Sequence, residues 1–239
     1  MGRLALVTGG SGFSCGELLT DAGYEVVLTS RRPEPLAEAA GRIGARWIAA
    51  DAADEHSFAT VVDGLDRIDL LMHAAMDILD GTFVRKERLE TFDRALRTNL
   101  RSTFVTSAAV LPRMRPGSRL VFISSSAARR GMKARSAYSA AKGGMHAFAE
   151  ALRDEVARDG IHVSVVTPAP VKTDMLQRVT FPMHALQARD VAEAVLFLDR
   201  LAPGVVVPDI AMRAAEEGPL APPPVQPAAF VAKTSRSSA

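Results

Sequence analysis

The sequence has little cysteine and few aromatic residues: one cysteine, one tryptophan and two tyrosines among 239 residues. A single thiol, Cys15, excludes an internal disulfide and fits a reducing compartment. No apolar run approaches the roughly 18 residues that a membrane-spanning helix needs. The first apolar run, residues 4–7, is typical of a strand and not of a signal peptide. We therefore expect a cytoplasmic protein that has no membrane partner.

An excess of charge of one sign is also missing. The 29 basic residues nearly balance the 27 acidic ones, which leaves a net charge of +2. This balance gives no reason to expect nucleic acid as a partner. The content of 48% hydrophobic and 23% charged residues is that of an ordinary globular protein. The length suits one α/β domain with a large buried core, and we expect no metal site.

Short apolar runs alternate with helical stretches along the chain. Since the runs lack strict polar alternation, they are typical of strands that are covered on both faces. The expected strands span residues 4–8, 25–29, 46–50, 69–74, 119–124, 162–167 and 205–210. The expected helices span residues 15–23, 34–43, 54–65, 86–113, 137–158 and 189–201. This order predicts a single Rossmann-type, doubly wound parallel sheet of about seven strands with helices on both faces.

The composition changes near the end of the chain. Residues 1–212 form the expected domain, and residues 213–239 form a tail rich in proline and alanine. Such a segment does not form a packed element alone. Two interpretations remain: a disordered tail, or an arm that docks on a neighbouring subunit through Phe230 and Val231.

The most informative pattern is a tyrosine and a lysine four residues apart, Tyr138 and Lys142, with Ser125 upstream. A spacing of four places both side chains on one helix face. An ammonium beside a phenol favours the phenolate, so we expect a lowered Tyr138 pKa and proton transfer at neutral pH. The alternative is a surface pair on an amphipathic helix.

A glycine-rich turn follows the first expected strand. It reads Thr8-Gly9-Gly10-Ser11-Gly12-Phe13-Ser14-Cys15-Gly16, and a helix is expected to follow. Glycines allow close approach of the backbone to a pyrophosphate, and the helix N-terminus offers free N–H groups. The turn therefore predicts a dinucleotide site.

Together, the turn and the Ser125, Tyr138 and Lys142 constellation make residues 3–212 resemble the short-chain dehydrogenase/reductase family. The resemblance implies four catalytic residues, namely Asn99, Ser125, Tyr138 and Lys142. Tyr138 would exchange the proton, and Ser125 would hydrogen-bond the substrate oxygen, or Ser124 or Ser126 if the register slips. Lys142 would act on Tyr138 and hold the nicotinamide ribose, and Asn99 would position a water against Lys142.

The resemblance also implies a set of cofactor contacts. Asp51 would hydrogen-bond the adenine, and Thr173 would contact the nicotinamide carboxamide. The complete expected set is Gly9, Ser11, Gly12, Ser14, Gly16, Ser30, Arg31, Arg32, Asp51, Ala74, Ala75, Tyr138, Lys142, Pro168, Val171 and Thr173. Singly, Asp51 could instead cap the next helix, and Asn99 could be an ordinary polar helix residue.

The sequence departs from the family pattern at two places. Phe13 or Ser14 occupies the middle glycine position of the turn, and Gly16 aligns with the last glycine. Met72-His73-Ala74-Ala75 stands where the family usually has Asn-Asn-Ala-Gly. The family segment helps to order the central sheet near the cofactor ribose, and His73 could supply a similar ordering hydrogen bond. Ala75 places a methyl group where the family has glycine. Both changes bear on cofactor affinity.

Charge indicates which cofactor is bound. NAD-preferring family members carry an acidic residue at the end of strand two, where this chain has Ser30, Arg31 and Arg32. Guanidinium groups bind a 2′-phosphate that a carboxylate would repel. The sequence therefore predicts NADP(H), with two solvated arginines in a turn as the alternative.

These observations predict an NADP(H)-dependent oxidoreductase that interconverts a carbonyl and an alcohol on a small or medium, largely apolar substrate. An apolar lid is expected from residues 174–188, and the basic segment 129–135 either recognises an anionic group or is a solvated loop. Small residues on the tyrosine helix favour a homodimer or homotetramer. The alternatives are a dinucleotide-binding protein with little turnover, in a sensor or interaction role, and an epimerase or dehydratase of the same family.

Overall fold

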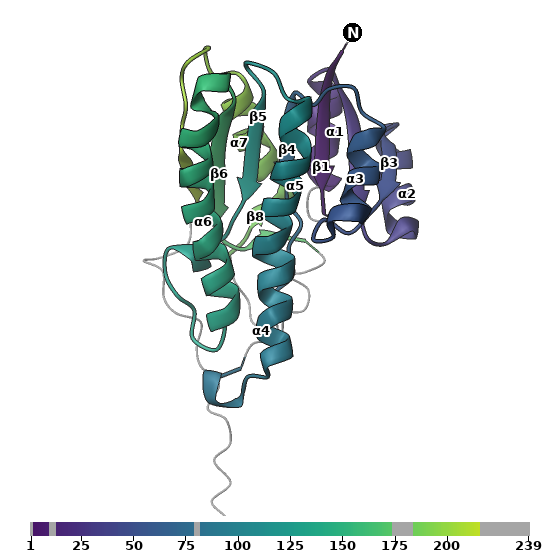
Figure 1. Cartoon of the computed structure of the whole chain (residues 1–239). Coiled ribbons are helices and arrows are strands. Elements are labelled where there is room, and N and C mark those ends of the chain that lie inside the picture. The colour runs from purple at the N-terminus through teal and green to yellow at the C-terminus, as the bar shows by residue number, and fades with distance from the viewer. Residues whose placement is uncertain (1, 10–12, 79–81, 174–183, 216–239) are drawn as a thin grey trace, which may run out of the picture.

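The computed structural model describes residues 2–9, 13–78, 82–173 and 184–215. Seven parallel strands form one sheet in the order β3-β2-β1-β4-β5-β6-β9 (Figure 1). Their bounds are β1 Arg3–Thr8, β2 Tyr24–Ser30, β3 Arg46–Ala49, β4 Leu70–His73, β5 Arg119–Ile123, β6 His162–Pro168 and β9 Asp209–Met212. The order reverses direction at β1 and β4, as in a doubly wound sheet. The predicted fold class is thus confirmed.

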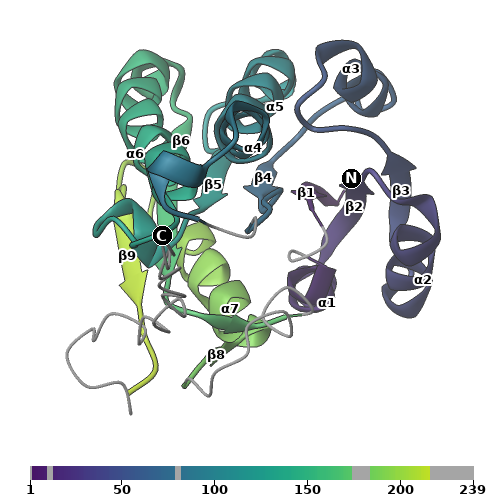
Figure 2. The same ribbon diagram turned by 90° about the horizontal axis from the view of Figure 1, so that it is seen from below.

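Helices cover both faces of the sheet (Figure 2). The helices are α1 Phe13–Asp21, α2 Pro33–Ile43, α3 Glu55–Asp63, α4 Leu89–Leu96, α5 Ser102–Val110, α6 Ser136–Val156 and α7 Ala188–Asp199. One face carries α3, α5 and α6, and the other carries α1, α2 and α7. Each layer has its own apolar core, because side chains of these buried strands point alternately to the two faces. Within the described residues, no helix combines the length and apolar character that a membrane crossing requires.

The last strand lies later than predicted. The sequence predicts a strand over 205–210, whereas β9 begins at Asp209 and ends at Met212. Val205 instead closes a turn through a hydrogen bond from its N–H to the carbonyl of Ala202. Pro208 has no N–H to donate to a ladder, so pairing with β6 starts after it.

The first helix and the long fifth helix also differ from the prediction. Helix α1 begins at Phe13, two residues early, and ends at Asp21, before Gly23 takes a left-handed φ of 86°. The stretch 86–113 is not one helix: α4 and α5 are separated by a π-helical turn, Arg97–Arg101 (η3). The preceding Glu87 and Arg88 are extended. Periodicity alone does not reveal a turn widened by one residue.

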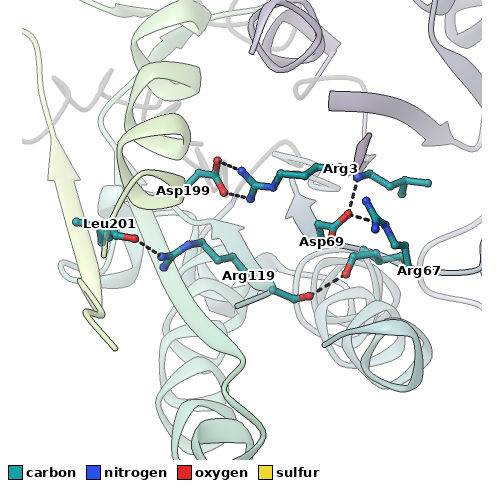
Figure 3. Close-up of polar contacts among 9 residues, drawn as sticks. Arg3, Arg67, Asp69, Arg119, Asp199 and Leu201 are labelled. Atoms are coloured by element: carbon teal, nitrogen blue, oxygen red, sulfur yellow. Dashed lines mark hydrogen bonds and ion pairs between the residues drawn. The ribbon is translucent and has the colours of Figure 1, made fainter. Parts of the chain in front are cut away.

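A polar cluster closes the amino-terminal end of the sheet (Figure 3). Arg3 forms a bidentate ion pair with Asp199, which ties β1 to the end of α7. Asp69 accepts the N–H of Leu4 at 2.7 Å and pairs with Arg67 at 3.1 Å. The buried Arg119 donates to the carbonyl of Leu201 at 3.2 Å. Since these groups stand where strands begin, the opposite edge is left for ligands.

Two glycines lie in close packing, and at Gly9 the neighbours are backbone atoms, which cannot move aside as the end of a side chain can. Gly9 has φ 84°, and a Cβ there would lie 2.6 Å from the carbonyl oxygen of Ala74 and from Cα of Ala75. Gly16 lies inside α1, where a Cβ would lie 2.8 Å from the Ile43 side chain. Gly9 therefore lets β1 end directly against the segment that follows β4.

A glycine pair tests this close approach. Gly9 and Gly204 share nearly the same left-handed φ, 84° and 81°, but the space around Gly204 is open. Gly204→Ala should lower the free energy of unfolding by about 1–2 kcal/mol from the backbone conformation alone. Gly9→Ala should cost roughly 1–3 kcal/mol more, because the methyl group overlaps backbone atoms. Urea unfolding measures both variants; equal losses would contradict the packing role of Gly9.

Candidate active site

The carboxyl ends of the strands bring the predicted residues to one edge of the sheet. Because all the strands of the main sheet are parallel, Gly9, Ser30 and Ser125, which follow or end β1, β2 and β5, all lie at this edge. Figure 1 shows α4 and the first turns of α6 extending beyond it. Ligands of doubly wound sheets bind at such an edge.

Helix α6 carries the tyrosine and the lysine on its buried face. Tyr138 is 5% exposed and Lys142 is fully buried. The Lys142 ammonium donates to the carbonyl oxygen of Ile123, the last residue of β5, at 3.0 Å. It lies 5.9 Å from the centre of the Tyr138 ring. The interpretation of these residues as a solvated surface pair is wrong, because both are in the interior.

Ser125 meets the tyrosine. It follows β5 in an extended conformation and begins a short 3₁₀ helix (η5, Ser126–Ala128), accepting the N–H of Ala127 at 3.2 Å. Its side chain also acts on the Tyr138 phenol and lowers the pKa of that group. Ser124 is 2% exposed, and its hydroxyl instead contacts His146 Nε2 at 2.9 Å. The described geometry therefore favours Ser125 over Ser124 as the partner of the phenol.

The pKa of Tyr138 differs from the expectation. Burial raises the pKa of the phenol, and the Ser125 hydrogen bond and the charge of Arg135 oppose that rise without cancelling it. Burial also lowers the pKa of Lys142 to about 7. The prediction of a lowered Tyr138 pKa is wrong for the protein alone, because loss of hydration outweighs neighbouring charge. Tyr138 is a protonated phenol at neutral pH.

Asn99 lies in the π-helical turn η3 and is fully buried. Its side-chain N–H₂ donates to the carbonyls of Asp77 and Ala95, at 3.0 and 3.1 Å, and its oxygen accepts the N–H of Asp77 at 3.2 Å. The side chain thus clamps the segment that follows β4. Its predicted role, positioning a water against Lys142, stays a prediction.

His73 ends β4 and occupies a fully buried hydroxyl cage. Its Nδ1 lies 3.1 Å from the hydroxyls of Thr8 and Thr106, and its Nε2 lies 3.3 Å from the hydroxyl of Ser102. These partners belong to β1 and α5, so the imidazole joins the centre of the sheet to the helix above it. The expectation that His73 supplies an ordering hydrogen bond is confirmed.

The residues at the ends of β2 and β3 fit the adenosine part of a dinucleotide phosphate. Arg31 and Arg32 follow Ser30 and are exposed, and within the described chain neither guanidinium is hydrogen-bonded or paired with a carboxylate. Exposed guanidinium groups of this kind suit a phosphate group. Asp51 accepts the N–H of Ala53 at 2.9 Å and pairs with Arg97 at 2.8 Å. It does not cap α3, because Asp54 does.

Other predicted contacts are placed only in part. Gly9, Ala74 and Ala75 lie together where β1 and β4 end, whereas Gly16 is buried inside α1. Pro168 ends β6, and Val171 and Thr173 follow it. Val171–Lys172 (β7) pairs with Leu186–Gln187 (β8) in a second, two-stranded sheet, whose strands are too short to be predicted from the sequence. Ser11, Gly12, the Ser14 side chain and residues 174–183 of the predicted lid lie outside the described residues, as does 216–239 of the predicted tail.

The basic segment 129–135 is not uniformly solvated. Arg129 pairs with Asp209 at 2.8 Å, and the Lys133 ammonium lies 5.5 Å from the centre of the Phe83 ring. Arg135 affects the pKa of Tyr138.

Three residues near the site were missed by sequence reasoning. His146 lies between the Ser124 hydroxyl, 2.9 Å from its Nε2, and the Asp209 carboxylate, 3.3 Å from its Nδ1, and Arg97 pairs with Asp51. His146 stands four residues after Lys142, so continuing the spacing of Tyr138 and Lys142 by one turn could have found it. No local signal marks Asp209 or Arg97.

A doubly wound sheet with a half-buried serine and a buried tyrosine and lysine at its carboxyl edge is typical of nucleotide-dependent oxidoreductases. The sequence matches the short chain dehydrogenase family over residues 3–182. The human 3-oxoacyl-[acyl-carrier-protein] reductase is 33% identical over 217 residues, covering 83% of this chain and 91% of that protein. The protein belongs to the short-chain dehydrogenase/reductase family.

Further relatives agree with this assignment. The acetoacetyl-CoA reductase of Cupriavidus necator is 34% identical over 193 residues, covering 74% of this chain and 78% of that protein. A solved short-chain dehydrogenase/reductase family protein superposes with a TM-score of 0.80 at 27% identity, covering 88% and 95% of the two chains. BdcA, solved in complex with NADPH, has a TM-score of 0.80 at 22% identity, covering 89% and 93%, and supports the fold alone.

The buried His73 should make stability depend on pH. Burial, together with the charge of Lys142, lowers the pKa of His73 from 6.5 to about 3. Below about pH 6.5 the unfolded chain takes up a proton that the folded chain does not. The free energy of unfolding therefore decreases as the pH is lowered, by up to about 1.4 kcal/mol per pH unit.

In His73→Asn this contribution is missing, so urea unfolding should show a shallower decline of stability between about pH 7 and pH 5. His56→Asn, at an exposed position in α3, is the control and should keep the wild-type slope. An unchanged slope in His73→Asn would show that the cost of protonating His73 in the folded chain does not limit stability in acid.

Proposed function

We propose that the protein is an NADP(H)-dependent reductase that converts a carbonyl into an alcohol. The observation that carries the proposal is the buried Tyr138 phenol, whose pKa the Ser125 side chain lowers, with Lys142 one helical turn away. Because the phenol is protonated at neutral pH, Tyr138 carries a proton that it can donate.

Each residue of the relay has a distinct part. Ser125 hydrogen-bonds the substrate oxygen beside the phenol, and Tyr138 transfers its proton to that oxygen as negative charge develops there. Lys142 holds the nicotinamide ribose and stabilises the tyrosinate that remains, and Asn99 fixes the segment after β4. When bound, the nicotinamide supplies the hydride.

The choice of NADP(H) rests on the charge at the end of β2. Ser30 stands where an acidic residue would contact the ribose hydroxyls, and two exposed arginines follow. Guanidinium groups bind a phosphate through paired, charge-assisted hydrogen bonds.

The relatives narrow the search for a substrate. The human protein is a 3-oxoacyl-[acyl-carrier-protein] reductase, and the Cupriavidus necator protein is an acetoacetyl-CoA reductase. We therefore propose 3-oxoacyl thioesters as the first candidates, beside small apolar ketones.

Removing the phenol hydroxyl tests the relay. Tyr138→Phe should lower kcat by at least about 10²-fold, the usual contribution of general acid catalysis, while NADPH affinity stays within about twofold. Absorbance of the nicotinamide band measures turnover over a panel of carbonyls that includes 3-oxoacyl thioesters.

Tyr24→Phe is the matched control, because Tyr24 is also buried but lies at the start of β2, away from this edge. Retained turnover in Tyr138→Phe would reject its role as the acid. If the wild type binds NADPH yet reduces nothing in the panel, a binding role without turnover is favoured instead.

A second experiment tests the cofactor. Replacing Arg31 and Arg32 together by alanine should raise the Kd of NADPH at least about tenfold, since hydrogen bonds to charged groups contribute roughly 1.5–3 kcal/mol. The Kd of NADH should change less than about threefold, because it lacks the 2′-phosphate. Arg42→Ala, on the exposed side of α2, is the control in the fluorescence titration. Equal weakening of both cofactors would contradict the proposal.

A further inference from the structure

Three side chains of α6, spaced by four residues, hold three consecutive residues where β5 ends. Tyr138 interacts with the Ser125 side chain, and Lys142 donates to the carbonyl of Ile123 at 3.0 Å. His146 Nε2 lies 2.9 Å from the hydroxyl of Ser124. Because a spacing of four keeps side chains on one helix face, His146 continues the row formed by the tyrosine and the lysine.

His146 is itself held from behind. Its Nδ1 lies 3.3 Å from a carboxylate oxygen of Asp209, the first residue of β9. Asp209 also accepts the hydroxyl of Thr167 at 3.1 Å and pairs with Arg129 at 2.8 Å. A carboxylate beside Nδ1 favours the tautomer that carries its proton on Nδ1, which leaves Nε2 as an acceptor for the hydroxyl of Ser124.

The order serine, histidine, aspartate is that of a hydrolase triad, but the geometry excludes a nucleophile. Ser124 is 2% exposed, so its oxygen does not reach a substrate. What Ser124 does adjoin is Ser125, whose hydroxyl accepts the N–H of Ala127 and meets the Tyr138 phenol. Ser124 thus connects the end of β5 to Ser125, the residue that contacts Tyr138.

We propose that His146 is a positioning residue of the reductase site, which fixes Ser124 and, through it, the place of Ser125 beside Tyr138. The inference rests on the proposed function for its catalytic readout. A merely structural alternative exists, because His146 also ties β9 to α6 through Asp209.

The surroundings of His146 keep it neutral, as an acceptor for Ser124 must be. Asp209, Arg129 and Lys142 are the described charged groups that act on it. Burial lowers the pKa of His146, and the charges of Arg129 and Lys142 add to that, whereas Asp209 opposes it.

Two substitutions separate the two roles. The amide of His146→Gln reaches the position of Nε2 and keeps the contact with Ser124, while Asp209 retains Thr167 and Arg129. The amide of His146→Asn reaches only the position of Nδ1 and keeps the contact with Asp209. If His146 positions Ser125, His146→Asn should lower kcat about tenfold or more with KM within about twofold, and His146→Gln should retain most of kcat.

A second readout needs no substrate. The chain has two tyrosines, so labelling with 3-fluorotyrosine gives two ¹⁹F resonances, which Tyr138→Phe assigns. His146→Asn should shift the Tyr138 resonance, and His146→Gln should leave it near its wild-type position. His56→Asn controls for histidine replacement at an exposed site, and thermal unfolding confirms that each variant is folded.

A larger effect of His146→Gln than of His146→Asn, equal effects of both, or no effect of either would overturn the proposal. The two hypotheses fail separately. Absence of turnover in the wild type counts against the reductase assignment, and the ¹⁹F comparison then decides the positioning role by itself.

Discussion

The contact between Lys142 and the end of β5 is the constraint on which the site depends. A fully buried ammonium is costly unless hydrogen bonds replace its lost hydration, and the Ile123 carbonyl, 3.0 Å away, supplies one of them. Within the described residues no carboxylate pairs with it, so burial shifts its pKa to about 7. The helix is thereby held in one register against the strand, and the same register places Tyr138 at Ser125.

Burial sets the protonation of the site before any ligand binds. Tyr138 stays protonated and His73 stays neutral because neither is hydrated enough to carry charge. The polar groups are satisfied by neutral partners: hydroxyls around His73, and backbone atoms around Asn99. Charged pairs stand farther out, at Asp51 with Arg97 and at Asp209 with Arg129. Apart from Lys142, the buried groups of the site are therefore neutral, and the charged pairs lie farther out.

The sequence predicted what depends on local pattern. The buried strands were found because runs of Val, Ile and Leu mark a sheet covered on both faces, and Tyr138 and Lys142 because four residues make about one helical turn. What it missed depends on distant partners. Asp209 contacts His146 across the fold, the strand expected at 205–210 was displaced by Pro208, and the pKa of Tyr138 follows from burial that spacing does not report.

The π-helical turn at Arg97–Arg101 has a consequence for insertions and deletions in this chain. A π-turn holds one residue more than an α-helical turn, so loss of a single residue there would restore a continuous α-helix. Because the wide turn spreads its extra residue over almost the same rotation, α4 and α5 would keep nearly the same orientation relative to each other. What would be lost is the local widening that holds Asn99, whose side chain bonds the backbone of Asp77 and Ala95. A change of length at this point would therefore act on Asn99 while the flanking helices stay in place.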